Sequence, residues 1–132
     1  MKTNLDSLFK TNQNLEDAGV WFDVSEKTGF LLRRFGGVNS SKIKATVAKI
    51  YKPYTRQVES GTLDPAKERE LEVRIFVETC VLNWRGIEID GMETPFEKEL
   101  AIKFFLSLPE LTNTLTKYAT DVANYKDDLG NF

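Results

Sequence analysis

Side chains that commonly carry chemistry are scarce in this 132-residue sequence, and histidine is absent. Histidine is the usual general base near neutral pH, the commonest metal ligand and the base partner of catalytic serine or cysteine. Cys80 is the single cysteine, so the chain can form neither an intramolecular disulfide nor a thiolate zinc site. One cysteine fits a reducing, cytoplasmic setting, and its apolar neighbours predict that it packs as a small hydrophobic side chain.

Acidic residues and glycines offer three further candidates for a chemical site, and none has the required pattern. Glu88, Asp90 and Glu93 do not match the spacing of a twelve-residue calcium loop, and Asp-Gly at 90–91 predicts a tight turn. Four glutamates of a predicted helix spread around it among basic residues, as on a solvated face: Glu68, Glu70, Glu72 and Glu78. The Gly-Gly pair at 36–37 is not followed by the Gly-Lys-Ser/Thr of a phosphate-binding loop. We therefore expect no enzyme, no metal and no cofactor.

The charge is segregated along the chain, although the net charge is only −2. Residues 27–58 hold eight basic side chains and no acidic one, whereas residues 59–132 hold eight basic and fifteen acidic ones. Three of the basic residues recur every seven positions, so a regular helix would align them on one side, away from its apolar stripe. The candidate basic face consists of Arg33, Arg34, Lys42, Lys49, Lys52 and Arg56.

Three interpretations of this basic face remain open. The simplest is a solvated helix face that pairs with the acidic half of the same domain. The second is contact with a protein partner that has an acidic surface, which the same field would steer. The third is binding of nucleic acid phosphates, with Tyr51 or Tyr54 stacking on bases. We expect no nucleic acid partner, because the chain is acidic overall and has no recognisable binding motif.

The elements that would position these residues form a mainly α single domain with an N-terminal β-hairpin, a minor α+β component. Residues 1–18 read as a polar arm or short helix, and residues 19–126 as the globular domain. Apolar β-formers on both sides of a turn-prone segment predict a hairpin over 19–35, with strands near 19–24 and 29–35. Hydrophobic spacings of three and four predict the helices, at about 39–60, 64–83, 95–108 and 110–126, before a polar tail at 127–132.

Local signals set the expected helix boundaries. Asn39 or Ser40 is expected to cap the first long helix, and Pro53 to kink it near 51–52. Asp64-Pro65 predicts the start of the next helix, which is apolar on all sides from Ile75 onward and should therefore be central and buried. Thr94 to Glu97 combines a capping box with a helix-start proline.

We expect no signal peptide and no membrane partner. The first ten residues lack the long apolar stretch of a signal sequence, and no run of about eighteen apolar residues exists.

Two stretches carry a family resemblance. The first is GVWFDV…GFLLRRFGGVNSSKIKATVAKIYKPY, and the second is ETCVLNWRGIEIDGMETPFEKELAIKFFLSLPELTNTLTKYATDVANY. Their order is an aromatic strand, an Arg-containing strand, a basic helix, an apolar helix ending in Leu-Asn-Trp-Arg-Gly, Pro-Phe, Leu-Pro-Glu-Leu and a last helix. This ordered set, over most of residues 19–126, resembles the tail assembly chaperones of long non-contractile-tailed bacteriophages (siphophage type).

The resemblance implies a function without catalysis. Such chaperones coat the tape measure protein in the host cytoplasm, keep it soluble during tail assembly, and leave when tail-tube subunits displace them, so the mature virion lacks them. It implies the tape measure protein as partner, with the tail-tube protein and self-association as further ones. No catalytic residues transfer. The landmarks that match are framework positions only: Trp21, Trp84, Gly86, Pro95, Phe96 and Pro109.

The last two predicted helices carry more apolar side chains than a small bundle needs. We hypothesise that part of this set forms a groove for an amphipathic client helix. The candidate client-binding residues are Phe104, Phe105, Leu108, Leu111, Leu115 and Tyr118. Two other functions stay open: a structural tail-completion or neck protein of the virion, and, less favoured, a nucleic-acid-binding regulatory module that uses residues 27–58.

Overall fold

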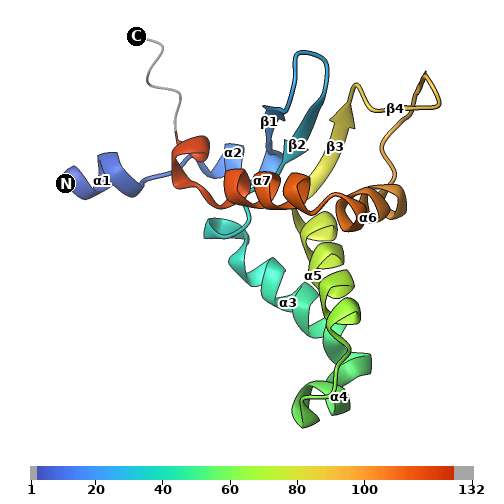
Figure 1. The fold of residues 1–132 in the computed structure, drawn as a ribbon. Helices are drawn as coiled ribbons and strands as arrows, with labels where there is room; N and C mark the ends of the chain where they lie inside the picture. Colours follow the sequence, from blue (N-terminus) through green and yellow to red (C-terminus); the bar gives the residue numbers. More distant parts are fainter. Residues whose placement is uncertain (1–2, 127–132) are drawn as a thin grey trace.

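The longest helix, α5 (Pro65–Cys80), occupies the centre of the protein in a computed structural model that describes residues 3–126 (Figure 1). The Asp64 side chain accepts a hydrogen bond from the Ala66 amide at 3.0 Å, and Pro65 takes the first helical position, as the sequence predicts. The helices α3 (Ser40–Tyr51) and α6 (Lys98–Ser107) pack against α5. The predicted central, buried helix is confirmed, and the domain is mainly α with a small sheet.

A three-stranded antiparallel sheet covers one end of α5, and its third strand differs from the sequence prediction. The hairpin of β1 (Val20–Asp23) and β2 (Gly29–Leu32) is confirmed, but its second strand ends at Leu32, three residues before the predicted boundary at 35. Residues 81–83 were expected to continue the helix, but β3 (Val81–Arg85) begins directly after Cys80 and pairs with β2, Trp84 opposite Phe30. Valine and tryptophan favour strands, and the hydrogen bonds of an open β2 edge decide between the two conformations.

The predicted helix at 39–60 is interrupted where Pro53 lies. After α3 the chain forms one 3-10 turn over 52–54 and then the short α4 (Thr55–Ser60). Proline cannot donate the amide hydrogen bond that a continuous helix needs, so the predicted kink is confirmed. Because α4 leaves the line of α3 (Figure 1), Lys42, Lys49 and Arg56 do not form the straight row that a regular helix would give.

The segment between β3 and α6 is a small hairpin followed by an extended stretch. The strands β4 (Glu88–Ile89) and β5 (Met92–Glu93) flank the predicted Asp90-Gly91 turn. The next helix starts at Lys98 instead of 95, and Glu97 forms no side-chain cap. The Trp84 indole Nε1 donates to the Thr94 carbonyl at 2.8 Å, while the Thr94 hydroxyl donates to the Met92 carbonyl. These bonds hold Thr94 outside the helix, so the predicted capping box does not form.

The last helix, α7 (Pro109–Thr120), starts at a proline but ends before the predicted boundary at 126. The Asp121 side chain accepts from the Ala123 amide at 3.0 Å and caps a separate 3-10 turn over 122–125. The predicted polar tail, 127–132, lies outside the described residues.

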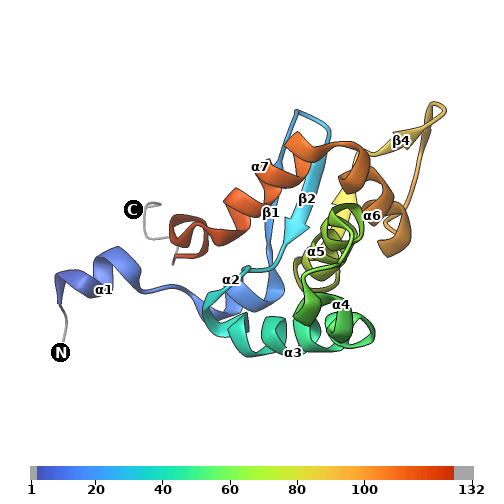
Figure 2. The ribbon, with the colours of Figure 1, turned by 60° about the horizontal axis from the view of Figure 1, so that its bottom comes forward.

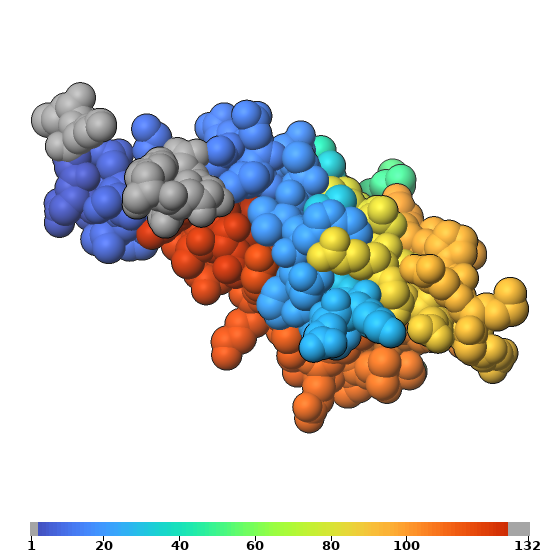
Figure 3. Space-filling model, turned by 90° about the horizontal axis from the view of Figure 1, so that it is seen from above, coloured from blue at the N-terminus to red at the C-terminus, as the bar shows by residue number. Residues whose placement is uncertain are grey.

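The N-terminal region divides into two short helices. The helix α2 (Gln13–Ala18) belongs to the body, because Glu16 is 2% exposed. The helix α1 (Asn4–Phe9) lies apart from the other helices in two views (Figures 1 and 2) and leaves Leu5, Leu8 and Phe9 exposed. Seen from above, α1 and the β4–β5 hairpin lie at opposite ends of the molecule (Figure 3). Only α1 therefore fits the predicted arm.

Aromatic rings join the sheet to the helices in the core. Phe30 of β2 lies 5.8 Å from the ring of Phe105 on α6, and Phe105 lies 6.2 Å from Phe76 on α5. Trp84 is 5% exposed and makes an edge contact with Phe96, ring centroids 5.2 Å apart. Trp84 is thus a core anchor. No helix within residues 3–126 is both long and apolar enough to cross a membrane.

The other framework landmarks have distinct local roles. The Arg85 guanidinium lies 4.4 Å from the centre of the Trp21 ring, which ties β3 to β1 across the sheet. Pro95 belongs to the extended stretch before α6, and Pro109 begins α7. Gly86 turns the chain after β3 with φ 71°, and a side chain there would overlap the carbonyl of Lys27.

Gly86→Ala is expected to destabilise the fold far more than Gly91→Ala. Both glycines have positive φ, where a Cβ costs roughly 1–2 kcal/mol, but only at Gly86 would the added carbon meet backbone. We expect Gly91→Ala to stay within that cost and Gly86→Ala to exceed it by at least about 1 kcal/mol. Urea unfolding of both variants measures the difference, and equal midpoints would contradict the close contact at Gly86.

Candidate functional site

The six apolar residues predicted to bind a client do not form one exposed face. Phe105 and Leu115 are fully buried, at 0% exposure, so they cannot line a groove, and this part of the prediction is wrong. Tyr118 is half-buried against Phe22, ring centroids 4.1 Å apart. The reason is the sheet: Phe30 of β2 packs against Phe105, and Phe22 of β1 packs against Tyr118, so these side chains belong to the core of the domain.

The remaining three residues gather at the corner between α6 and α7. Phe104, Leu108 and Leu111 line a shallow depression of about 220 Å³ beside the start of the β4–β5 hairpin. Leu108 is 51% exposed, and the other two are half-buried. Part of the predicted set thus meets at one surface feature, but that feature is small for a helix-binding site.

A groove between α3, α5 and α7 has a volume of about 640 Å³. Its apolar lining consists of Phe35, Val47, Val73, Ile75 and Phe76. The α5 residues among these form the floor of the groove and are almost fully buried, whereas Val47 on α3 is 36% exposed. The volume lies within the roughly 300–1,000 Å³ of typical ligand sites. We take this groove as the candidate functional site.

Polar side chains surround the apolar floor of the groove. Tyr51 and Glu72 lie at the end formed by α3 and α5, and Arg69 and Lys117 also line it. The pKa of the Tyr51 hydroxyl is raised by burial and then by the nearby carboxylates of Glu72 and Glu68. The Tyr51 end of the groove therefore carries negative charge, and the lysine of the α7 wall carries positive charge.

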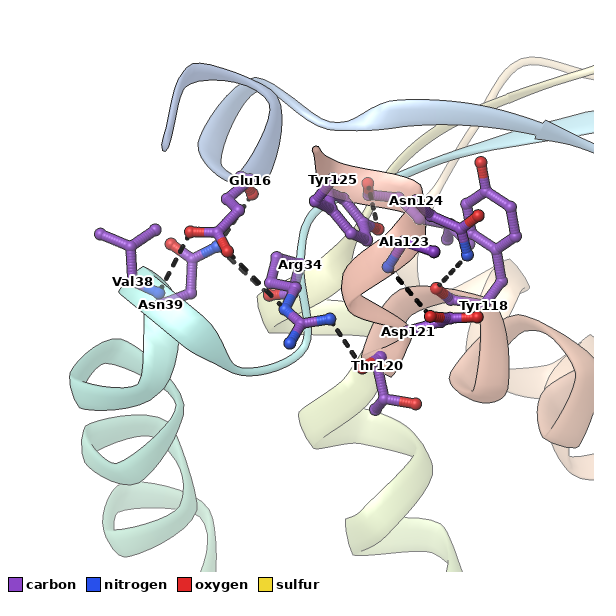
Figure 4. A network of polar contacts seen from close by, with 11 residues as sticks. Glu16, Arg34, Val38, Asn39, Tyr118, Thr120, Asp121, Ala123, Asn124 and Tyr125 are labelled. Atoms are coloured by element: carbon purple, nitrogen blue, oxygen red, sulfur yellow. Dashed lines mark hydrogen bonds and ion pairs between the residues drawn. The ribbon is translucent and has the colours of Figure 1, made fainter. Parts of the chain in front are cut away.

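A buried polar network fixes the two outer walls of the groove at one end (Figure 4). Arg34 donates from Nη1 to the Thr120 carbonyl, at the end of α7, at 2.6 Å. The Glu16 carboxylate lies 3.8 Å from Nε of Arg34 and accepts from the Val38 amide, just before α3, at 3.3 Å. Phe35, part of the groove lining, donates its amide to the Ala119 carbonyl at 2.9 Å. The start of α3 and the end of α7 are thus held together.

Asn39 completes this network instead of capping the helix with its side chain. Its amide donates to the carbonyls of Glu16 at 2.9 Å and Arg34 at 3.2 Å, and the side chain makes no capping bond to α3. Asn39 does occupy the cap position, so the predicted start of the helix is right and the predicted capping bond is wrong. The carbonyls of Glu16 and Arg34 need a hydrogen-bond donor inside the protein, so the Asn39 side chain turns toward them and not toward the first turn of α3.

The predicted basic face is smaller than the sequence indicates. Arg34 is enclosed in the network, and Arg33 pairs with Asp17 at 3.5 Å with 20% of its side chain exposed, so neither belongs to an exposed basic surface. Lys42, Lys49, Lys52 and Arg56 are exposed, and their side chains make no ion pair within residues 3–126. The pairing with the acidic half of the domain, which the simplest of the three interpretations requires, is therefore absent for these four residues in the described part of the chain.

Tyr51 and Tyr54 are not placed for base stacking. Tyr51 lines the groove beside Glu72, and the Lys67 ammonium lies 5.8 Å from the centre of the Tyr54 ring. Cys80 is fully buried, which confirms its predicted packing role, and burial raises the pKa of its thiol to about 12. Within residues 3–126 no cluster of three or more Asp, Glu or Cys side chains could hold a metal ion.

A family model described as YdaY prophage protein matches residues 38–129, well over half of the chain. The chain belongs to the YdaY prophage protein family. It is therefore of phage origin, and the matched region begins just before α3 and includes all three walls of the groove. The β1–β2 hairpin and the N-terminal helices of this prophage protein precede the match. No curated protein and no solved structure matches the chain significantly.

Sequence reasoning missed the groove because its lining comes from three distant segments. Val47 belongs to the apolar stripe of the predicted basic helix, and Phe76 to the predicted buried helix. The available signal was the stripe itself, since Val47 and Tyr51 extend an apolar face on a helix that is otherwise rich in basic residues. The stripe does not show that α7 lies opposite it across a groove.

Glu16→Gln is expected to destabilise the protein strongly, and Asp17→Asn to have little effect. The first change keeps the shape of the side chain but leaves the Arg34 guanidinium, 14% exposed, without its counter-charge. We expect a loss of roughly 3 kcal/mol, as for other broken buried pairs. Asp17, 66% exposed, pairs with Arg33 at the surface, and its change should cost less than about 1 kcal/mol. Urea unfolding tests both, and similar midpoints would show that the buried pair does not hold the network.

The stability of the protein is expected to fall as the pH rises above 9. The Cys80 pKa rises from 9.0 to about 12 on folding, so the unfolded chain loses this proton first and the free energy of unfolding decreases with pH. The contribution is complete below pH 9 and amounts to about 1 kcal/mol lost by pH 10. Urea unfolding at pH 8 and pH 10 measures it. Cys80→Ala, as control, should show a shallower decline, and an unchanged decline would assign the effect to the tyrosines.

Proposed function

We propose that this prophage protein is a tail assembly chaperone that binds the tape measure protein through the groove between α3, α5 and α7. The observation that carries the proposal is the groove itself, an open apolar channel of about 640 Å³ bounded by helices. An amphipathic helix can lay its apolar face into such a groove, with contacts at three- and four-residue spacing. The tape measure protein, a long helix-rich chain, supplies segments of this kind.

Phage origin and the sequence resemblance support the same proposal. The family match places the chain among prophage proteins. The ordered landmarks from Trp21 to Pro109 are those by which the sequence resembles tail assembly chaperones. In this role the protein is a binding protein, not an enzyme; it acts in the host cytoplasm and is absent from the finished virion, and it needs neither cofactor nor metal.

Weak binding at each site suits this role. Many copies along one client add avidity without requiring high affinity from any single groove. The floor of the groove is almost fully buried and its α3 wall is only partly exposed, so each copy offers a client a limited contact area. Tail-tube subunits that polymerise around the client can then displace the copies one at a time.

Co-expression with the tape measure protein of the same prophage tests the function. We expect the client to stay soluble and to co-purify with the wild-type chain. Val47→Asp places a charge in the groove and should abolish co-purification, while Val58→Asp, the same change at an exposed α4 position outside the groove, should not. Leu108→Asp tests the smaller depression at the α6–α7 corner and should also leave binding intact.

Three results would contradict the proposal. An insoluble client in the presence of the wild-type chain would exclude the chaperone function. Loss of binding in Leu108→Asp, with normal binding in Val47→Asp, would move the site to the α6–α7 corner. Detection of the chain in purified virions by mass spectrometry would favour a structural tail-completion or neck protein instead.

A further inference from the structure

Basic side chains lie in or beside the groove on both of its outer helices, α3 and α7. Lys117 of α7 is among its lining residues. On α3, Lys44 lies three residues before Val47 and seven before Tyr51, and residues at these spacings share one face of a helix. Lys44 is therefore on the same side of α3 as these two lining residues, beside the groove and not in its lining, and it is exposed. Neither ammonium group makes an ion pair within residues 3–126.

The charges around the groove do not cancel. The Arg69 guanidinium, on α5, donates to the Phe105 carbonyl at 3.3 Å and adds a third cation. The negative charges near the groove are those of Glu72, which lines it, and Glu68, which is close to Tyr51. The outer face of α3 carries Lys42 and Lys49, about one helix diameter from the groove and so within roughly one Debye length of it. Cations are in excess, and the excess lies toward α3 and α7.

We propose that the groove binds an acidic amphipathic helix, one whose apolar stripe is flanked by carboxylates. The apolar stripe would cover Val47 and Phe76, and the flanking carboxylates would reach the ammonium groups of Lys44 and Lys117 on opposite walls. This inference rests on the proposed function for the place where the client binds, and it adds the chemical class of the segment that is bound.

The alternative polyanion, a nucleic acid, fits this site poorly. Its phosphates would have to lie over an apolar floor formed by Val73, Ile75 and Phe76, which offers them no hydrogen-bond donor. A helix with apolar and acidic faces satisfies both the floor and the walls.

Two synthetic peptides with the same leucine stripe test the proposal. One carries glutamate and the other lysine at the flanking positions, and both are labelled for fluorescence anisotropy with the full-length chain. Two ion pairs at partly exposed positions predict roughly tenfold tighter binding of the acidic peptide at 50 mM NaCl. At 500 mM NaCl the difference should shrink severalfold because salt screens exposed charges.

Charge-reversal variants locate the effect. The double variant Lys44→Glu/Lys117→Glu should bind the lysine peptide more tightly than the glutamate peptide. The matched control Lys98→Glu/Lys103→Glu makes the same change at two exposed positions of α6 that do not line the groove, and the wild-type preference should persist. Val47→Asp should weaken both peptides, and circular dichroism verifies that each variant is folded.

Several outcomes would overturn the inference. These are equal affinity for the two peptides, a preference that the control variant reverses as well, or a twenty-base-pair DNA duplex that displaces the acidic peptide. A fourth is a dimer of the free chain that Phe9→Ser dissociates, with a gain in peptide binding. That result would show that α1 of a second copy occupies the groove.

The peptide result is independent of the co-expression result. Acidic peptide binding without client solubility would refute the chaperone function alone, and client solubility with equal peptide affinities would refute the acidic preference alone.

Discussion

The arrangement of this protein depends on one buried ion pair, Glu16 with Arg34. Both side chains are almost fully removed from water, so each charge needs partners inside the protein. The partners come from different segments: the Val38 backbone amide ahead of α3 donates to Glu16, and the Thr120 carbonyl at the end of α7 accepts from Arg34. The Asn39 side-chain amide adds hydrogen bonds to the backbone carbonyls of both residues. Satisfying the pair therefore fixes α2, the connection from β2 to α3, and the end of α7 relative to one another.

The groove follows from this constraint and from the packing around α5. The helix α5 is buried on several sides, with α3 packed on one side and α6 on another. Its C-terminal end leads directly into β3, which pairs with β2 in the sheet. Once the polar network holds α3 and α7 at one end, the space between them stays open above Val73 and Phe76. The helix α3 can thus keep an apolar side toward α5 and the groove, and a basic side toward water, with no fully buried residue of its own.

Much of the secondary structure was predictable because local signals and tertiary packing agree. The hairpin around residues 25–28, the start of α5 at Asp64-Pro65, the break at Pro53 and the turn at Asp90-Gly91 each rest on backbone preferences of a few neighbouring residues. The errors lie where distant residues compete with those preferences. Pairing with β2 turned residues 81–83 into a strand, the Trp84 indole held Thr94 out of α6, and the carbonyls of Glu16 and Arg34 drew the Asn39 amide away from its cap.

The amino-acid sequence alone determined what this protein lacks and which elements it forms: no histidine, one cysteine that packs as a hydrophobic side chain, a basic helix beside an acidic body, and a mainly helical domain. Composition and short-range periodicity are properties of neighbouring residues, so they can be read without a fold. The tertiary structure decided which apolar residues are exposed. Phe105 and Leu115 follow the same apolar periodicity as the groove residues, yet both are fully buried in the core, while Val47 and Tyr51 face an open groove. Exposure depends on what packs opposite a residue, and here the opposing segments lie far away in the chain.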